Sequence, residues 1–501
     1  MQGGQARPSD ASHASADTGE AAPSRHAPGV AALPGGRLTA LQRTDQSRAE
    51  LARIRREISG WLDDKEKAPH GKAALHATRL AALRQILLGA LDVLDGAVGR
   101  VDVASIPIWA VYAECRRIDE SAVWLQRVWA YYREKFDQRE KATIQDVLSA
   151  ADELVWSCYQ QVFVEGAEVP TGVAPGPAPL AYIDDSYAPA TWDSSRLSPG
   201  ALREGRQTAG LEAFLQTLPV GVIQLPPWCI DAPWNLAFIA HEVGHNIQNR
   251  LKLTTSFGTL LEQAAADGTP SSATPSRWAG WGAEIFADIY SAAMIGDAAA
   301  IALRELQVGS PEAMATSTDA YPAPLMRLEI IHRTATRLGL VATPTAPTSG
   351  FGIAGPRGAM LDSDLAVLDR VLDAASGPLN PAGVTFSSLA GVNGVRDDFL
   401  KRGSFWGTAL SAKPTAPNRG LETARYVIHG AWLAWQAIAA TTDETDRAAA
   451  LALLATNTVQ TLTISGPEGT RAGPGDASFA DEGARLGLEL LGLGSDSVAD
   501  P

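Results

Sequence analysis

The segment His241–His245, with the sequence HEVGH, limits strongly how this chain can fold. The chain has only eight histidines in 501 residues, and two of them stand here, four residues apart, around a glutamate. Residues at i and i+4 share one face of a helix, so both imidazole rings can bind the same metal ion. From Ala232 to Ile247 these three side chains are the only ionisable ones. The pattern therefore predicts a buried helix whose ionisable groups are paired or bound to a metal.

The start of this helix is predicted from two residues. Asp231 suits the N-cap position, and Pro233 suits the first turn. In zinc hydrolases with the HExxH pattern, the two histidines bind Zn²⁺ and the glutamate activates a water molecule. The pattern predicts these roles for His241, His245 and Glu242. The alternative is a coincidental match, in which the two histidines are core residues satisfied by hydrogen bonds.

A catalytic zinc site needs a third protein ligand, and the spacing of the candidates selects among them. The metzincin pattern is excluded because Gln248 and Leu251 stand where that pattern needs Gly and His. The gluzincin pattern takes a glutamate from a later helix, with an aspartate four residues further on. Glu284 and Asp288 fit this pattern, and they are the only charged residues over 278–296.

Two alternatives to this assignment stay open. Glu262 is a competing third ligand because it is closer to His245 in sequence, but Ala266 stands where the accompanying aspartate would be. Alternatively, Glu284 and Asp288 form a short acidic stripe that faces solvent. The apolar residues around them argue against a solvated face.

Residues 220–335 resemble the gluzincin metallopeptidases, on the motif HEVGH followed by Glu284 and Asp288. The resemblance implies a zincin-like domain that binds one Zn²⁺ per chain through His241, His245 and Glu284, with Glu242 as general base. Asp288 would orient a ligand histidine, because a carboxylate on the far ring nitrogen fixes the tautomer. The 38 residues between His245 and Glu284 exceed the gap in compact members and imply an insertion at 268–276.

The segments around the motif suggest the shape of a cleft. The β-branched run within Pro219–Trp228 predicts a strand. This is either a core strand or the edge strand that lies along the cleft in gluzincins and pairs with extended substrate. Four tryptophans flank the two motif helices and either line an apolar substrate pocket or belong to the core; they are Trp228, Trp234, Trp278 and Trp281.

A peptidase also needs a hydrogen-bond donor for the oxyanion that forms on the substrate. Tyr321 stands just before a helix predicted to run to about residue 338, and Arg327 lies within it. The layout resembles the Tyr-Pro plus arginine segments of several zincin families, which implies Tyr321 as the donor. His332 and His429 are alternative donors. If Tyr321 is not the donor, it is an exposed loop residue.

Composition restricts the partners and the compartment. The formal net charge is −14 and no basic cluster stands out, which argues against nucleic acid or anionic membrane as the main partner. No uncharged apolar run reaches the roughly 18 residues of a membrane span. The N-terminus lacks the apolar segment of a secretory signal, and three cysteines suit a reducing compartment. A cytoplasmic location is expected, with non-classical export left open.

The apolar periodicity predicts a mainly α chain of the α+β class. A helical domain is expected over 36–168, where Leu51, Ile54, Ile58 and Leu62 recur at helix spacing. It is followed by the zincin-like domain at 169–345, with a small sheet and two metal-binding helices. A C-terminal helical region at 346–465 and a flexible tail at 466–501, with one short helical patch at 482–491, complete the chain. Residues 1–35 are expected to be disordered.

The function expected from the motif and the resemblance is zinc-dependent hydrolysis of peptide bonds, with a peptide or protein as substrate. Two alternatives stay open: a zinc hydrolase of another amide, and a binding or regulatory module in which zinc is structural. Intact Glu242 argues against the second, because a structural zinc site has no use for a general base. An exported effector with peptidase activity is also compatible with the N-terminus, and the oligomeric state is left open.

Overall fold

The computed structural model describes residues 36–67, 72–163, 176–192, 220–266, 276–341, 353, 355–380, 382–390, 396–412, 423–440, 443–466 and 479–496. The predicted N-terminal segment 1–35 and, apart from Ser276, the predicted insertion lie outside these residues. The described part is mainly helical and contains one small sheet, as predicted. None of its helices combines the length and the apolar character needed to cross a membrane.

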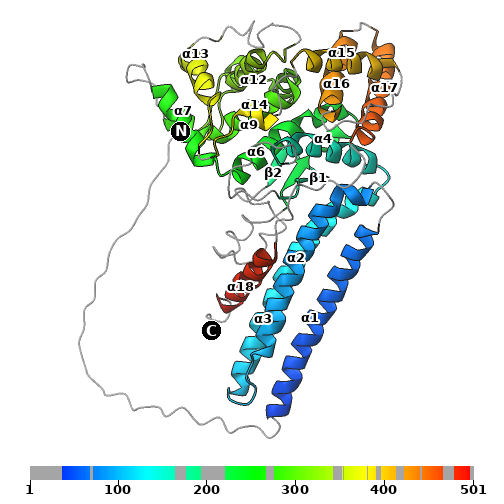
Figure 1. Ribbon diagram of the computed structural model, residues 1–501, viewed down its shortest axis with the longest axis vertical. Coiled ribbons are helices and arrows are strands. Elements are labelled where there is room, and N and C mark those ends of the chain that lie inside the picture. The colour runs from blue at the N-terminus through cyan, green and yellow to red at the C-terminus, as the bar shows by residue number, and fades with distance from the viewer. Residues whose placement is uncertain are drawn as a thin grey trace, which may run out of the picture.

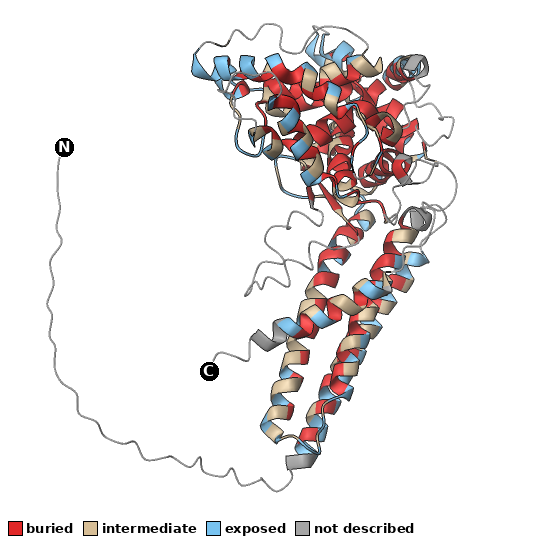
Figure 2. Cartoon of the chain, turned by 60° about the vertical axis from the view of Figure 1, so that its left-hand side comes forward, coloured by how far each residue is buried: buried red, intermediate tan, exposed pale blue. Residues whose placement is uncertain are grey.

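Three long helices form an arm that projects from a more compact body (Figure 1). They are α1 (Gly36–Glu66), α2 (Lys72–Gly99) and α3 (Ile108–Asp137). The leucine and isoleucine positions predicted from helix spacing, Leu51 and Ile54 among them, are buried between these helices. Figure 2 shows buried residues on the inner faces of the arm and exposed residues on the outer faces.

The C-terminal part of the chain returns to this arm. Helix α18 (Ala480–Asp496) packs against α2 and α3, so this portion of the expected flexible tail is a docked helix. Glycines allow the close approach: a Cβ atom added at Gly483 would lie 2.7 Å from the carbonyl oxygen of Gln85, and one at Gly487 would lie 2.6 Å from Cβ of Val93. A larger side chain at either glycine would force α18 away from α2.

The helices of the body pack around one continuous apolar core. Helix α4 (Gln145–Phe163), predicted as part of the N-terminal helical domain, belongs to this core and packs against α6 and α17. The predicted catalytic and C-terminal regions also share it. Its helices besides α4 are α6 (Phe238–Arg250), α7 (Thr254–Ala266), α8 (Ser276–Gly280), α9 (Gly282–Ile295), α10 (Ala298–Gln307), α11 (Pro311–Met314), α12 (Pro324–Leu338), α13 (Pro356–Ala375), α14 (Phe386–Ala390), α15 (Arg396–Ala412), α16 (Thr423–Ala439) and α17 (Glu444–Thr463).

The sheet has three short strands in the order β1-β3-β2. They are β1 (Leu180–Ile183), β2 (Ala190–Trp192) and β3 (Val222–Leu225). β1 runs parallel to β3, whereas β2 runs antiparallel to it. The strand predicted within residues 219–228 is therefore β3, the central strand, and its use as the edge strand of a cleft is ruled out. Among the described strands, β1 and β2 are the two edges of the sheet, and β2 packs against α6.

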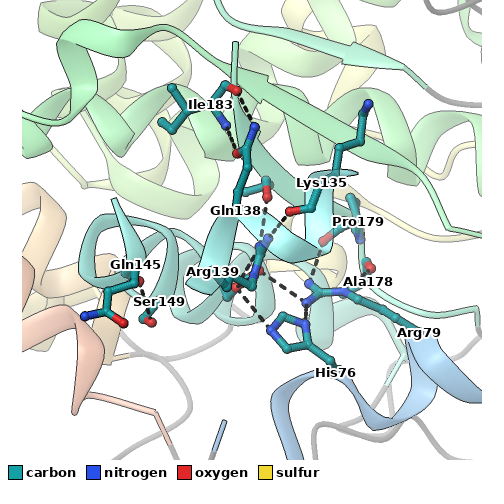
Figure 3. Close-up of polar contacts among 12 residues, drawn as sticks. His76, Arg79, Lys135, Gln138, Arg139, Gln145, Ser149, Ala178, Pro179 and Ile183 are labelled. Carbon is teal, nitrogen blue, oxygen red and sulfur yellow. Dashed lines mark hydrogen bonds and ion pairs between the residues drawn. The ribbon is translucent and has the colours of Figure 1, made fainter. Parts of the chain in front are cut away.

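A buried polar network joins the arm to the sheet (Figure 3). Arg79 of α2 donates hydrogen bonds to the carbonyl oxygens of Ala178 and Pro179, at 2.8 and 2.5 Å. Arg139 donates to both carboxylate oxygens of Asp152, at 2.8 and 2.9 Å, and Arg79 contacts the same carboxylate at 3.2 Å. Because buried charges need such partners, this network holds the segment entering β1 in a fixed place. The short 3₁₀ segment η1 (Gln138–Glu140) provides Arg139.

Candidate metal centre

The helix that carries the HEVGH segment is buried, as predicted, but it begins differently. A 3₁₀ turn, η3 (Pro233–Ala237), leads directly into α6, with Pro233 in the first turn as expected. Ala232, not Asp231, precedes that turn, and no side chain of the described residues caps it, so the predicted N-cap is wrong. Cys229 and the apolar side chains of η3 pack in the core instead. Tertiary packing of η3, rather than capping, therefore sets the helix start.

Gly244 brings α6 against α9. A Cβ atom added at Gly244 would lie 3.0 Å from Cα of Ala287 and 3.1 Å from Cβ of Tyr290. Ordinary carbon contacts are about 3.5–4.0 Å, so only glycine permits this helix separation. The close approach sets the face of α6 that carries the two histidines opposite the face of α9 that carries Glu284.

Three donor side chains meet between these helices. His241, His245 and Glu284 each offer one ligand atom, and these atoms all lie within 4.8 Å of one another. Nε2 of His241 lies 3.2 Å from Nε2 of His245 and 3.3 Å from Oε2 of Glu284. Nε2 of His245 lies 3.6 Å from Oε1 of Glu284. All three side chains are largely buried, with 14, 7 and 3% of their surface exposed for His241, His245 and Glu284.

These distances fit a metal ion. Ligand atoms about 2.0–2.2 Å from a tetrahedral ion are separated by roughly 3.3–3.6 Å. Nε2 of His241 lies at about this distance from Nε2 of His245 and from one oxygen of Glu284, and Nε2 of His245 lies 3.6 Å from the other oxygen of Glu284. Two imidazoles and one carboxylate are also a donor set that Zn²⁺ uses when it keeps an open position. The cluster could therefore hold a metal ion, and its donors suit zinc.

Asp288 lies behind the cluster, one helical turn after Glu284. Its Oδ1 is 3.0 Å from Nδ1 of His241, and its side chain is fully buried. A proton held on Nδ1 leaves Nε2 of His241 free to bind a metal ion. Burial alone would lower the pKa of His241, but hydrogen bonds to Asp288 and Glu284 raise it to about 9.

Arg327 of α12 completes the network. Its Nε and Nη2 donate to the two carboxylate oxygens of Asp288, both at 2.8 Å, and Nη2 also lies 3.3 Å from Oε2 of Glu284. Burial would raise the pKa of Glu284, but Arg327 and the histidines hold it well below its usual range. Arg327 has a similar effect on the pKa of Asp288, against the effect of burial. Both carboxylates are therefore charged at neutral pH.

Glu242 lies beside the cluster and not within it. Its side chain is buried and lines the same pocket as the donor side chains. The pocket lining has three carboxylates, those of Glu242, Glu284 and Asp288, and one guanidinium, that of Arg327, and this excess of acidic groups favours a bound cation.

The edge strand is tied to the same helix. Nδ2 of Asn246 donates to Oγ1 of Thr191 in β2 at 2.6 Å and to the carbonyl oxygen of Glu242 at 3.0 Å. One asparagine thus links the strand to the turn of α6 that carries Glu242. This link places β2 along the pocket, whose lining includes Ala188 to Thr191.

The pocket beside the cluster has a volume of about 290 Å³. Tyr321 lines it at the mouth and is 44% exposed, directly before α12. Another part of the lining comes from α10, whose apolar residues were not part of the sequence prediction. The helical spacing of Ala299, Ala302, Leu303 and Leu306 was visible in the sequence, but nothing indicated which partner that face would meet.

Several other predicted candidates lie away from the cluster. Glu262, on α7, is absent from both the donor cluster and the pocket lining, so the structure brings Glu284 and not Glu262 to the histidines. His332 of α12 does not line the pocket. His429 is fully buried, and its Nδ1 lies 2.9 Å from the carbonyl oxygen of Ile295. These two positions do not favour either histidine as the oxyanion donor.

The four flanking tryptophans belong to the core rather than to the pocket. Trp234, Trp278 and Trp281 are buried, and Trp228 packs edge-to-face on Phe238 with ring centroids 6.0 Å apart. None of the four lines the pocket. Phe238, one turn before His241, is the aromatic residue of α6 that does.

Comparison with protein-family models, with curated proteins and with solved structures finds no match for this chain.

Proposed function

We propose that this protein is a zinc-dependent hydrolase of peptide bonds, of the gluzincin type expected from the sequence. The observation that carries the proposal is the convergence of His241, His245 and Glu284 beside a separate, buried Glu242 that lines the same pocket. Three donors and a neighbouring pocket match a catalytic site with an open position, whereas structural zinc sites are closed by four protein ligands.

The residues around the cluster have distinct roles in this proposal. Zn²⁺ held by the three donors would act as a Lewis acid and lower the pKa of a water molecule towards 7. Glu242 accepts the proton from the attacking water and passes it to the leaving amine. Asp288 holds His241 in the tautomer whose Nε2 faces the other donors, and Arg327 keeps Asp288 ionised.

One feature of the pocket supports a peptide rather than another amide, and a second supports amide hydrolysis in general. β2 lines the pocket and pairs with β3 on one side, so an extended peptide could add to the sheet along the cleft. Tyr321 stands at the mouth, on the same pocket as Arg327, and is assigned as the donor to the oxyanion. Main-chain pairing of this kind binds peptides independently of most of their side chains.

The test of this function is the substitution Glu242→Gln. The amide is nearly isosteric with the carboxylate but cannot accept the proton, so we expect full zinc binding and a loss of at least about 100-fold in peptide hydrolysis. Zinc content is measured by elemental analysis, and hydrolysis by mass spectrometry of a broad peptide library. Glu262→Gln is the matched control and should behave as wild type. Cleavage by Glu242→Gln at close to the wild-type rate would disprove the mechanism.

A further inference from the structure

One wall of the pocket is apolar and comes from a helix outside the metal-binding motif. Ala299, Ala302, Leu303 and Leu306 recur at the spacing of one face of α10, and all four line the pocket. Ile331 of α12 adds to the same lining. The metal cluster and Glu242 line the pocket as well, so one cavity has a charged part and an apolar part.

At the end of this wall lies a buried hydrogen-bond acceptor that has no donor among the described residues. Gln307, the last residue of α10, lines the pocket, and its Oε1 is buried with no hydrogen-bond partner among the described residues. Leaving a buried acceptor unpaired is unfavourable, so a group bound in the pocket that supplies an N–H would be stabilised there. A peptide has such a donor beside every side chain.

We propose that the α10 wall is a specificity subsite, which selects substrates with a large aliphatic side chain next to the scissile bond. The side chain lies against Leu303, Leu306 and Ile331, and the two alanines leave room for it. Gln307 accepts a hydrogen bond from a backbone N–H of the same substrate. This inference rests on the proposed function for the reaction itself, but the subsite can be measured without any reaction.

The binding test uses two metal-directed probes that differ in one side chain: the hydroxamates of N-acetyl-leucine and N-acetyl-glycine. Their affinities for the zinc-loaded full-length protein are measured by titration calorimetry. Since burying a leucine side chain removes its apolar surface from water, we expect the leucine probe to bind roughly 10- to 100-fold more tightly. Equal affinities, or no binding of the leucine probe, would overturn the subsite.

A matched pair of variants tests the wall. Leu306→Lys places a charge in the proposed subsite, at a half-buried residue that lines the pocket. Val308→Lys, two residues later, adds the same charge at a residue that is 60% exposed and does not line the pocket. We expect Leu306→Lys to reduce the preference for the leucine probe by about 10-fold and Val308→Lys to retain it. The same preference in both variants would refute the assignment of this wall.

Two further measurements complete the design. Gln307→Leu removes the acceptor at similar volume and should weaken both probes by the same few-fold factor, because both carry the N–H; circular dichroism checks that each variant is folded. Digestion of a peptide library by the wild type separates the two proposals. Cleavage without an aliphatic preference refutes the subsite and leaves the peptidase function standing. Tight binding of the leucine probe without any cleavage supports the subsite and refutes the peptidase function.

Discussion

Gly244→Ala should destabilise the protein, although it replaces glycine by alanine inside a helix. In an exposed helix interior this substitution stabilises by up to about 1 kcal/mol. At Gly244 the added Cβ would lie 3.0 Å from Cα of Ala287, which is backbone and cannot rotate away. Overpacking of this kind costs about 1–3 kcal/mol. We therefore expect a net loss of about 1–2 kcal/mol in the free energy of unfolding.

The same substitution should weaken zinc binding. Relieving this contact requires α6 and α9 to separate by a few tenths of an ångström. His241 and Glu284 lie on opposite sides of this contact, with their ligand atoms 3.3 Å apart. Metal–ligand distances tolerate only about 0.2 Å of error, so the separation exceeds what the site allows. We expect at least about a 10-fold loss of zinc affinity.

Gly60→Ala provides the control. Gly60 lies within α1, and nothing lies within 4 Å of a Cβ atom added there. In urea denaturation, the free energy of unfolding should therefore rise relative to the wild type in Gly60→Ala and fall in Gly244→Ala. Zinc titration should show a loss of affinity in Gly244→Ala alone. If Gly244→Ala is as stable as Gly60→Ala and binds zinc normally, the close contact between α6 and α9 does not position the site.

Three other results are expected. Glu284→Ala should release zinc and abolish hydrolysis, and Glu262→Ala should leave both nearly intact; the reverse outcome in a zinc titration would mean that the wrong helix has been assigned. Asp288→Ala should retain zinc with an affinity about 10- to 100-fold lower, because the ligand His241 loses the carboxylate 3.0 Å from its Nδ1. Burial, followed by Arg139 and Arg79, lowers the pKa of His76 well below 6.5. Below about pH 6.5 the unfolded chain therefore binds a proton at His76 that the folded protein does not bind. The free energy of unfolding should keep its full value above about pH 6.5 and fall below it by up to about 1.4 kcal/mol per pH unit. His76→Asn should flatten this slope in denaturation curves measured at pH 7 and pH 5.

The side chains of the donor cluster could be predicted because each is an ionisable group in an otherwise apolar helix. Such groups need partners when buried, and their i, i+4 spacing showed which of them share a face. Glu284 and Glu262 could be ranked by the aspartate that accompanies only the former. The bidentate contact of Arg327 with Asp288 was not predicted, because it depends on how α12 packs against α9.

Other features depend on packing that no local pattern reveals. α4 has the same helical periodicity as α1 to α3, and only its tertiary contacts show that it belongs to the core of the body. β2 has only three residues, too few for an alternating pattern. It is nevertheless an edge strand of the sheet, whereas the predicted strand β3 is central. In the C-terminal tail only a short helical patch could be predicted, whereas α18 is longer and packs on α2, because its glycines allow a close approach.

The most direct test of the central claim is the zinc content of the purified full-length protein and of the double variant His241→Ala, His245→Ala. Elemental analysis should find about one zinc ion per chain in the wild type and almost none in the double variant, because one carboxylate cannot hold the ion tightly by itself. Circular dichroism shows whether the variant retains its helical fold. One zinc ion per chain in the folded double variant would contradict the assignment of this site.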